Sequence, residues 1–269
     1  MCFEPITTLS GGVPVHVACR QEDEFRLRAD ALKAAITPKT KLVIMPFPNN
    51  PTGAVFSKEQ LQAWVDFANK NGSIILFDAA YEAFIEDETL PHSIFELENA
   101  ETCAIEICSL SKTAGFTGTR LGYTVISKSL VRDGMNLNDM WVRNRTTKTN
   151  GVSYVIQKGG AAVFTDEGQR QIHDNIKIYK NNAKILMEAL DKVGIWYTGG
   201  KNAPYIWLKC PNGMGSWELF DYLLNNAQIV GTPGEGFGSC GEGYFRFSTF
   251  GSLEDTTLAA QRLVDLFKK

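Results

Sequence analysis

The segment SLSKTAGFTGTR, residues 109–120, places a lysine, two serines and an arginine within one turn-rich stretch. The apolar run TCAIEIC at 102–108 predicts a buried strand before it, and LGYTVI at 121–126 predicts another after it. Lys112 therefore follows the carboxyl end of a strand, which is the edge of an open α/β sheet where ligands bind. This placement predicts an α/β fold with a functional lysine at the sheet edge.

The groups around Lys112 fit an aldehyde that carries a phosphate. A lysine among apolar neighbours and near other cations loses its proton more readily, and the neutral amine can attack an aldehyde. Ser109 and Ser111 precede the lysine and Arg120 follows it, and hydroxyls with a guanidinium fork bind a phosphate dianion. Together these groups indicate pyridoxal 5'-phosphate. Taken alone, the stretch favours an ordinary surface loop, so other residues must decide.

Two strands upstream also end in polar residues. KLVIMPF at 41–47 predicts a strand that runs into the turn sequence NNPTG, which presents Asn50. SIILFD at 73–78 ends on Asp78, and Tyr81 follows three residues later. A carboxylate there would keep a pyridinium nitrogen protonated, and the tyrosine would donate to the ring's phenolate oxygen. The plainer alternatives are an Asn-Pro turn, a carboxylate that caps a turn, and a core tyrosine.

A helix is predicted between these two strands. Ser57 and Gln60 have the spacing of a capping box, and Gly72 ends the helical pattern. The alternation of strand and helix predicts a mainly parallel sheet, in which the carboxyl ends of the strands share one edge. All the candidate ligands named so far then lie on that edge.

Composition excludes several classes of protein. The 269 residues are 44% apolar and 21% charged with a net charge of −3, which is ordinary for a globular chain of one or two cores. No basic field for nucleic acid, no apolar run of membrane-spanning length and no signal-peptide pattern is present. The six cysteines lack CxxC spacing and the three histidines are isolated, so no disulfide framework and no metal site is predicted. We expect a cytoplasmic protein that binds neither nucleic acid nor membranes.

The motifs together resemble a known family. NNPTG, DAAY, SLSK and the arginine eight residues after the lysine resemble the aspartate aminotransferase superfamily, the fold-type I pyridoxal phosphate enzymes. The blocks FDAAYEAFI, SLSKTAGFTGTR, NAPYIWLKCPNGMGSWELFDYLL and VGTPGEGFGSCGEGYFRFSTFG are similar to the LL-diaminopimelate aminotransferases within it, from about Lys41 to the C-terminus. This resemblance implies amino transfer from LL-diaminopimelate to 2-oxoglutarate in lysine biosynthesis, by a homodimer whose active site is shared across the interface.

Other activities stay open. Residues 1–40 look more like other class I aminotransferases, which keeps aspartate and aromatic substrates possible. The β-lyases share the same cofactor site, so the same residues also fit lyase chemistry.

The resemblance also assigns roles to individual residues. The catalytic residue is Lys112, the cofactor-binding residues are Asn50, Asp78, Tyr81, Ser109, Lys112 and Arg120, and the substrate-binding residues are Asn50, Asn150 and Arg246. Arg246 lies in the strand-like YFRFSTF and needs an anionic partner, either the substrate α-carboxylate or a carboxylate of the protein. Asn150 reaches the active site of the partner subunit in the family, and an Asn-Gly turn is the alternative.

The domain organisation follows from the same comparison. We expect a large pyridoxal phosphate-binding domain at 1–167, and a long linking helix with a small α+β domain at 168–269. Residues 11–20 predict a turn followed by a short alternating strand. Further strands are predicted at 203–209, 228–231 and 243–249, and helices at 25–36, 168–194, 216–226 and from Ser252. Complete relatives carry on the order of a hundred or more further N-terminal residues, with part of the phosphate site. We therefore expect this chain alone to be a weak catalyst or a non-catalytic remnant that binds the cofactor.

Overall fold

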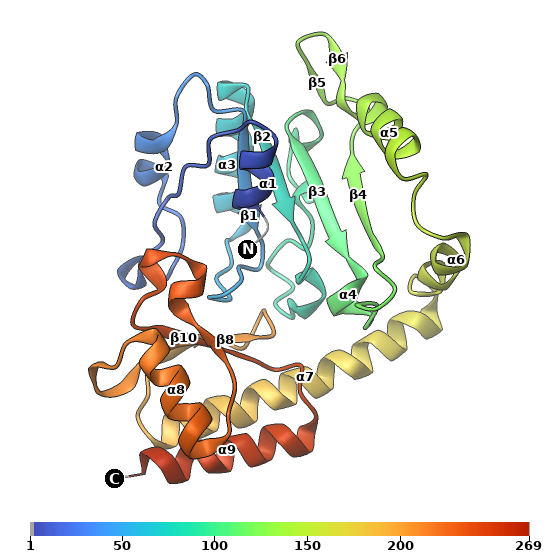
Figure 1. The fold of residues 1–269 in the computed structure, drawn as a ribbon. Helices are drawn as coiled ribbons and strands as arrows, with labels where there is room; N and C mark the ends of the chain where they lie inside the picture. Colours follow the sequence, from blue (N-terminus) through green and yellow to red (C-terminus); the bar gives the residue numbers. More distant parts are fainter. Residues whose placement is uncertain (1–2, 269) are drawn as a thin grey trace. The chain divides into compact units, whose positions relative to one another are not determined.

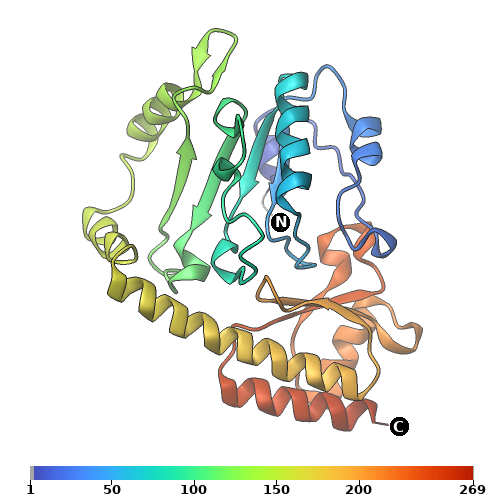
Figure 2. The same ribbon diagram turned by 180° about the vertical axis from the view of Figure 1, so that it is seen from behind.

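The computed structural model describes residues 3–268, which form two compact units (Figures 1 and 2). The lysine unit, named for Lys112, comprises Pro38–Pro48 and Val55–Lys177. The arginine unit, named for Arg246, comprises the described residues up to Thr37, Asn49–Ala54, and the described residues from Ile178 onward. The helix α7 (Asp166–Lys192) runs from one unit into the other. The domain boundary after residue 167 stays a prediction.

The lysine unit is built on a four-stranded, mainly parallel sheet. Its strands are β1 (Leu42–Pro46), β2 (Ile74–Asp78), β3 (Ala104–Ser109) and β4 (Gly122–Ile126), in that spatial order. The first three are parallel and β4 runs antiparallel to β3. The connection before β4 contains only the four-residue helix α4 (Leu110–Thr113), which is too short to return the chain to the far end of the sheet.

Helix α3 (Lys58–Asn71) packs against this sheet with an apolar stripe. Its buried side chains are Leu61, Trp64, Val65 and Ala68. The predicted capping box is confirmed, because the Gln60 backbone N–H donates to Ser57 Oγ (3.2 Å) and the Ser57 N–H donates to Gln60 Oε1 (2.9 Å). The left-handed Gly72 (φ 69°) ends the helix, as predicted.

The arginine unit has its own antiparallel sheet. Its strands are β7 (Tyr197–Gly199), β8 (Tyr205–Lys209), β10 (Tyr244–Ser248) and β9 (Thr232–Pro233), in that spatial order. Helices α8 (Ser216–Ala227) and α9 (Leu253–Phe267) and the second part of α7 pack with it. The predicted long helix, the helix from 216 and the helix capped by Ser252 are confirmed.

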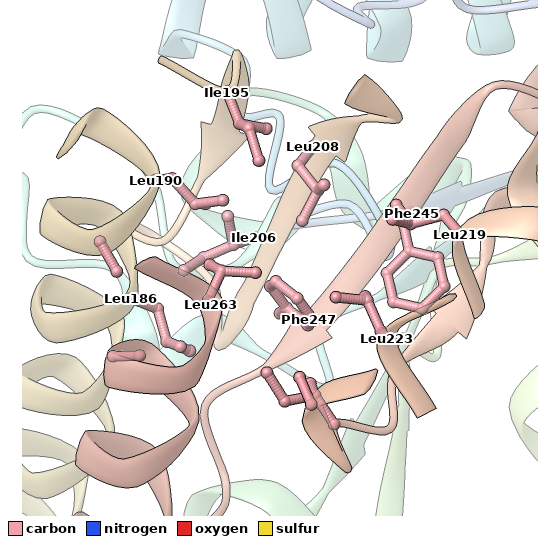
Figure 3. Close-up of a cluster of buried hydrophobic side chains, with 14 of the residues drawn as sticks. Leu186, Leu190, Ile195, Ile206, Leu208, Leu219, Leu223, Phe245, Phe247 and Leu263 are labelled. Atoms are coloured by element: carbon pink, nitrogen blue, oxygen red, sulfur yellow. The ribbon is translucent and has the colours of Figure 1, made fainter. Parts of the chain in front are cut away.

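One apolar core holds this unit together (Figure 3). Alternate residues of the two central strands point into it, namely Ile206 and Leu208 from β8 and Phe245 and Phe247 from β10. The helices contribute Leu186, Leu190, Leu219, Leu223 and Leu263. Each of these two strands therefore has one face in the core and an opposite face that does not contribute to it.

Several sequence predictions were wrong or misplaced. The strand predicted within residues 11–20 does not form: the segment is irregular, and it leaves Val13 and Val15 85% and 63% exposed. The strand predicted at 228–231 pairs instead at 232–233, and the helix predicted at 25–36 is the shorter α2 (Ala29–Ala35).

Some elements were not predicted at all. They include helices α1 (Phe3–Leu9), α5 (Leu137–Lys148) and α6 (Tyr154–Ala162), strand β7, and the hairpin of β5 (Val131–Arg132) and β6 (Met135–Asn136). Across residues 3–268, no helix combines the length and the apolar character needed to cross a membrane.

Candidate functional site

The lysine unit gathers its predicted residues at the carboxyl edge of the sheet. Asp78 is the last residue of β2 and lies in register with Ile107 of the parallel β3. Ser109 ends β3 two residues later, and Lys112 lies in the short helix α4 that follows at once. Because parallel strands end at a common edge, the carboxylate, the hydroxyl and the amine come from neighbouring positions of one rigid sheet.

Asp78 is held in a partly desolvated position. Burial raises the pKa of its carboxyl group, and a hydrogen bond from the Ala80 backbone N–H (3.1 Å) opposes that shift. The burial effect is the larger of the two. A cationic partner beside this carboxylate would offset the cost of its burial.

The two ends of the SLSKTAGFTGTR segment lie beside each other. Ser109 pairs with Gly122 across β3 and β4, and the Leu110 N–H donates to the Leu121 carbonyl oxygen (3.2 Å). Arg120, which directly precedes Leu121, is therefore close in the fold to the start of α4. Its side chain is exposed, and its Nη1 donates to the Thr117 carbonyl oxygen (2.7 Å).

The start of α4 is shaped by Ser109. Its Oγ accepts a hydrogen bond from the Ser111 N–H (3.2 Å), so this hydroxyl acts as the N-cap of the helix that carries Lys112. Lys112 itself is half-buried. Arg120 has a left-handed backbone (φ 57°), a conformation that is uncommon for a residue with a side chain.

Two further candidates of this unit have clear backbone positions. Tyr81 is buried and precedes the short 3-10 helix Glu82–Phe84, and its carbonyl oxygen accepts from the Phe84 N–H (3.0 Å). Asn150 is exposed and left-handed (φ 52°), and its N–H donates to the Arg145 carbonyl oxygen (3.0 Å) at the end of α5. Asn150 thus lies just beyond the end of α5, and its role in a partner subunit's site stays a prediction.

The arginine unit brings its two predicted residues into direct contact. Arg246, in β10, donates from Nη1 to Asn50 Oδ1 (2.7 Å) and from Nη2 to Thr232 Oγ1 (3.2 Å). Asn50 and Arg246 are 196 residues apart in the sequence, and each was predicted separately to bind substrate. The sequence did not predict Thr232, which pairs with Arg246 across β9 and β10.

A close backbone approach fixes the turn that carries Asn50. A Cβ added to Gly53 would lie 2.9 Å from the Gly199 Cα, and one on Gly199 would lie 3.0 Å from the Thr52 carbonyl oxygen. Both glycines also have positive φ (71° and 86°). The NNPTG turn therefore packs tightly on the strand β7, where only glycine fits on both sides.

Two aromatic rings lie next to the Arg246 guanidinium. Its Cζ is 4.3 Å from the ring centroid of Tyr205 and 4.9 Å from that of Phe237, both within the range of a cation–π attraction. Neither ring was predicted from the sequence. For Tyr205 the signal was the alternation in YIWLK and YFRFS, which places Tyr205, Trp207 and Tyr244 on the arginine's side of the two strands. Phe237 lies in the loop after β9, where no such alternation applies.

The Cys108 thiol of β3 is not reactive. Burial raises the pKa of the Cys108 thiol to about 12, so this thiol stays protonated. Among residues 3–268, no cluster of three or more His, Cys, Asp or Glu side chains could hold a metal ion.

Comparison with known proteins gives consistent results. The family model for aminotransferase class I and II matches residues 2–263. An LL-diaminopimelate aminotransferase of Agathobacter rectalis is 54% identical over 222 residues, which are 82% of this chain and 55% of that protein. The solved structure of an L,L-diaminopimelate aminotransferase from Chlamydomonas reinhardtii matches with a TM-score of 0.86 at 42% identity, covering 93% of this chain and 60% of that one.

A more distant structure defines the fold. Aspartate aminotransferase from Thermus thermophilus matches with a TM-score of 0.86 at 23% identity, over 98% of this chain and 66% of that one. The chain thus has an aspartate aminotransferase-like α/β fold. It spans 55% of the length of the curated relative from Agathobacter rectalis.

Proposed function

Because the chain belongs to the class I and II aminotransferase family, we propose that it transfers amino groups with pyridoxal 5'-phosphate. The observation that carries the proposal is the position of Lys112 one short helix beyond β3, at the sheet edge where Asp78 ends β2. The proposed exchange is between LL-diaminopimelate and 2-oxoglutarate, a step of lysine biosynthesis. The 54% identity with the Agathobacter rectalis enzyme supports that choice of substrate.

The residues of the lysine unit fit the cofactor by their chemistry. The Lys112 amine matches the aldehyde, and the Ser109 hydroxyl and the exposed Arg120 guanidinium match the phosphate. The Asp78 carboxylate is destabilised by burial, and the positive charge of a protonated ring nitrogen would offset this cost. Tyr81 would donate its hydroxyl to the ring oxygen. When bound, the cofactor supplies an electron sink for the bond that breaks at the substrate's α-carbon.

Lys112 has the second role of moving a proton. In its neutral form, Nζ would take the proton from the substrate's α-carbon. The helix α4 holds this lysine beside a rigid strand end, which limits how far Nζ can stray from the reacting carbon. Ser109 contributes by capping that helix as well as through its hydroxyl.

Arg246 and Asn50 would bind the substrate carboxylate. A guanidinium fork makes paired, charge-assisted hydrogen bonds to a carboxylate, and Asn50 orients this fork through its 2.7 Å hydrogen bond. Every amino acid has an α-carboxylate, so this pair would serve both the donor and the acceptor. Asn50 is proposed to contact the cofactor as well.

The organisation of the protein forms part of the same proposal. We assign the cofactor-binding domain to residues 1–167 and the linking helix with the small domain to 168–269. We further propose a cytoplasmic homodimer in which Asn150 reaches the partner subunit's active site.

A half-reaction tests the proposed chemistry. The chain loaded with pyridoxal phosphate is mixed with LL-diaminopimelate, and pyridoxamine phosphate and the keto acid are quantified. Amino transfer yields both in equal amounts, and a Lys112→Ala variant yields neither at a comparable rate. Release of ammonia without pyridoxamine phosphate would overturn the proposal in favour of a lyase.

The same assay decides between substrates. Aspartate and phenylalanine replace LL-diaminopimelate in parallel reactions at equal concentration. The proposal expects the fastest conversion with LL-diaminopimelate. Conversion of aspartate or phenylalanine with none of LL-diaminopimelate would assign the protein to the aspartate or aromatic aminotransferases.

A further inference from the structure

The face of the arginine unit's sheet that points away from the core carries an aromatic layer. In the pairing of β8 with β10, Arg246 lies opposite Trp207, while Tyr205 and Tyr244 lie two residues away on the same face. The Trp207 and Tyr244 rings stack with their centroids 5.4 Å apart and an angle of 10° between them. On this face Arg246 lies among the rings, whereas the other charged residue of the two strands, Lys209, is exposed at the end of β8 opposite Tyr244.

The layer continues into the glycine-rich loop after β9. Phe237 ends the 3-10 helix Gly234–Phe237, and its ring meets the Trp207 ring edge-on at a centroid distance of 5.6 Å. A Cβ on Gly234 would collide with the Gly241 carbonyl oxygen, and it would lie 2.9 Å from the end of the Trp207 ring. The glycine therefore lets this loop close tightly on the sheet, which brings the Phe237 ring to the arginine.

The contacts of Arg246 constrain its guanidinium in two different ways. Hydrogen bonds from Nη1 to Asn50 and from Nη2 to Thr232 fix the rotation of the guanidinium within its own plane, because hydrogen bonds are directional. The rings of Tyr205 and Phe237 attract the cation itself and restrict its tilt. A guanidinium held in one orientation loses less entropy when it binds a carboxylate.

We propose that Phe237 and Tyr205 are positioning residues that hold Arg246 in the orientation that binds the α-carboxylate of an amino acid. This inference rests on the proposed function, because it assumes that Arg246 is the carboxylate-binding residue. Phe237 is the better residue to substitute, because it lies in a loop segment and its ring is half-buried. Its replacement removes the π face without opening the core of the unit.

Glutarate, a dicarboxylate without an amino group, serves as the probe. The whole chain is titrated with glutarate, and binding is followed by the NMR signal of the Arg246 Nε–H group, identified by its loss in Arg246→Lys. Phe237→Leu should weaken glutarate binding about three- to fivefold, the size of one cation–π contact. Phe237→Tyr, which restores a ring, should return the affinity to that of the wild type.

Controls separate positioning from general damage. Phe220→Leu makes the same substitution at another half-buried phenylalanine of the unit, in α8, and should leave the glutarate affinity unchanged even if it lowers the melting temperature. Tyr205→Phe should also retain the affinity, because it retains the ring. Tyr205 is only 4% exposed, so its replacement by leucine can affect folding. The melting temperature of Tyr205→Leu is therefore measured first to show that this variant folds.

The outcomes distinguish the inference from the function on which it rests. The Arg246→Ala variant lacks the Nε–H signal of Arg246, so glutarate binding to this variant is followed by the NMR signals of the tryptophan indole N–H groups. If the wild-type chain binds no glutarate, or if Arg246→Ala binds it equally well, the proposed carboxylate role of Arg246 fails. If Arg246→Ala abolishes binding but Phe237→Leu binds like the wild type, the carboxylate role stands and the positioning role of the ring is overturned.

Discussion

Asp78 shows how a residue proposed to bind the cofactor can cost stability. Burial raises its pKa in the folded chain above the ordinary value of 3.8, so the unfolded chain gives up this proton more readily. The stability contributed by the protonated carboxyl is therefore present below the unfolded pKa and is lost as the pH rises through the folded pKa. Without cofactor, an amide at this position should stabilise the fold at neutral pH.

The first prediction concerns Asp78→Asn in the cofactor-free chain. Its free energy of unfolding should exceed that of the wild type at about pH 8, and the difference should shrink toward about pH 4. Urea unfolding at several pH values measures it. Asp66→Asn, at an exposed position of α3, controls for the substitution itself. A difference in unfolding free energy between Asp78→Asn and the wild type that does not change with pH would contradict the effect of burial on this carboxyl group.

Single residues could be predicted where a strand end and a turn both constrain the chemistry. Asp78 and Lys112 lie at the sheet edge expected from the sequence, because buried strands are easily recognised and parallel strands end together. The contacts of Arg246 with Thr232 and Phe237 could not be predicted in the same way. They depend on strand register and on loop closure, which local sequence does not encode.

At the scale of elements, β3 contains a buried carboxylate that organises its surroundings. Glu106 is 6% exposed, and its Oε2 accepts hydrogen bonds from Ser93 Oγ (2.6 Å) and the Ile94 N–H (3.0 Å). These bonds fix the start of the 3-10 helix Ile94–Glu96 against the strand. The carboxylate therefore satisfies polar groups that would otherwise be buried without partners.

The second prediction is that Glu106→Ala lowers the free energy of unfolding by about 1–3 kcal/mol, because it leaves these donors unsatisfied. Glu106→Gln retains an acceptor oxygen and should lose less. Urea unfolding of both variants at one pH gives the comparison. Equal losses for the two would show that charge rather than hydrogen bonding matters at this position.

The third prediction concerns the start of α3. Ser57→Ala removes the capping oxygen that accepts the Gln60 N–H, and it should cost about 1 kcal/mol of unfolding free energy. Ser57→Asp, which retains a capping acceptor, should cost much less. A loss of less than a few tenths of a kcal/mol in Ser57→Ala would mean that the capping box contributes little here.

Elements with a one-sided apolar pattern were the ones that the sequence predicted well. The stripe of α3 and the alternation of β8 and β10 each place one face in a core, which sets the period of the pattern. Helix α5 was missed because it has no buried side chain and hence no apolar stripe to detect. The strand expected at 11–20 had the alternation of a strand but no partner strand.

At the scale of the whole molecule, the fourth prediction compares the cofactor affinity of this chain with that of a longer relative. The chain spans 55% of the length of the Agathobacter rectalis enzyme, so the affinity of these residues alone for pyridoxal phosphate can be compared with that of a longer enzyme. We expect the isolated chain to bind pyridoxal phosphate more weakly than that enzyme by roughly a hundredfold or more, and to turn over correspondingly slowly. Titrations of both proteins under identical conditions measure the difference. Equal affinity and turnover would show that these residues suffice.

The most direct test of the central claim asks whether Lys112 is the residue that binds the cofactor aldehyde. The chain is saturated with pyridoxal phosphate, its visible absorption is recorded, and borohydride then fixes the bound group for peptide mapping by mass spectrometry. Lys128→Ala, at an exposed lysine of the same unit, controls for adducts on surface amines. We predict a visible band that persists in Lys128→Ala, is absent in Lys112→Ala, and maps to the peptide containing Lys112. A band of equal strength in Lys112→Ala, or a label spread over surface lysines alone, would contradict the account.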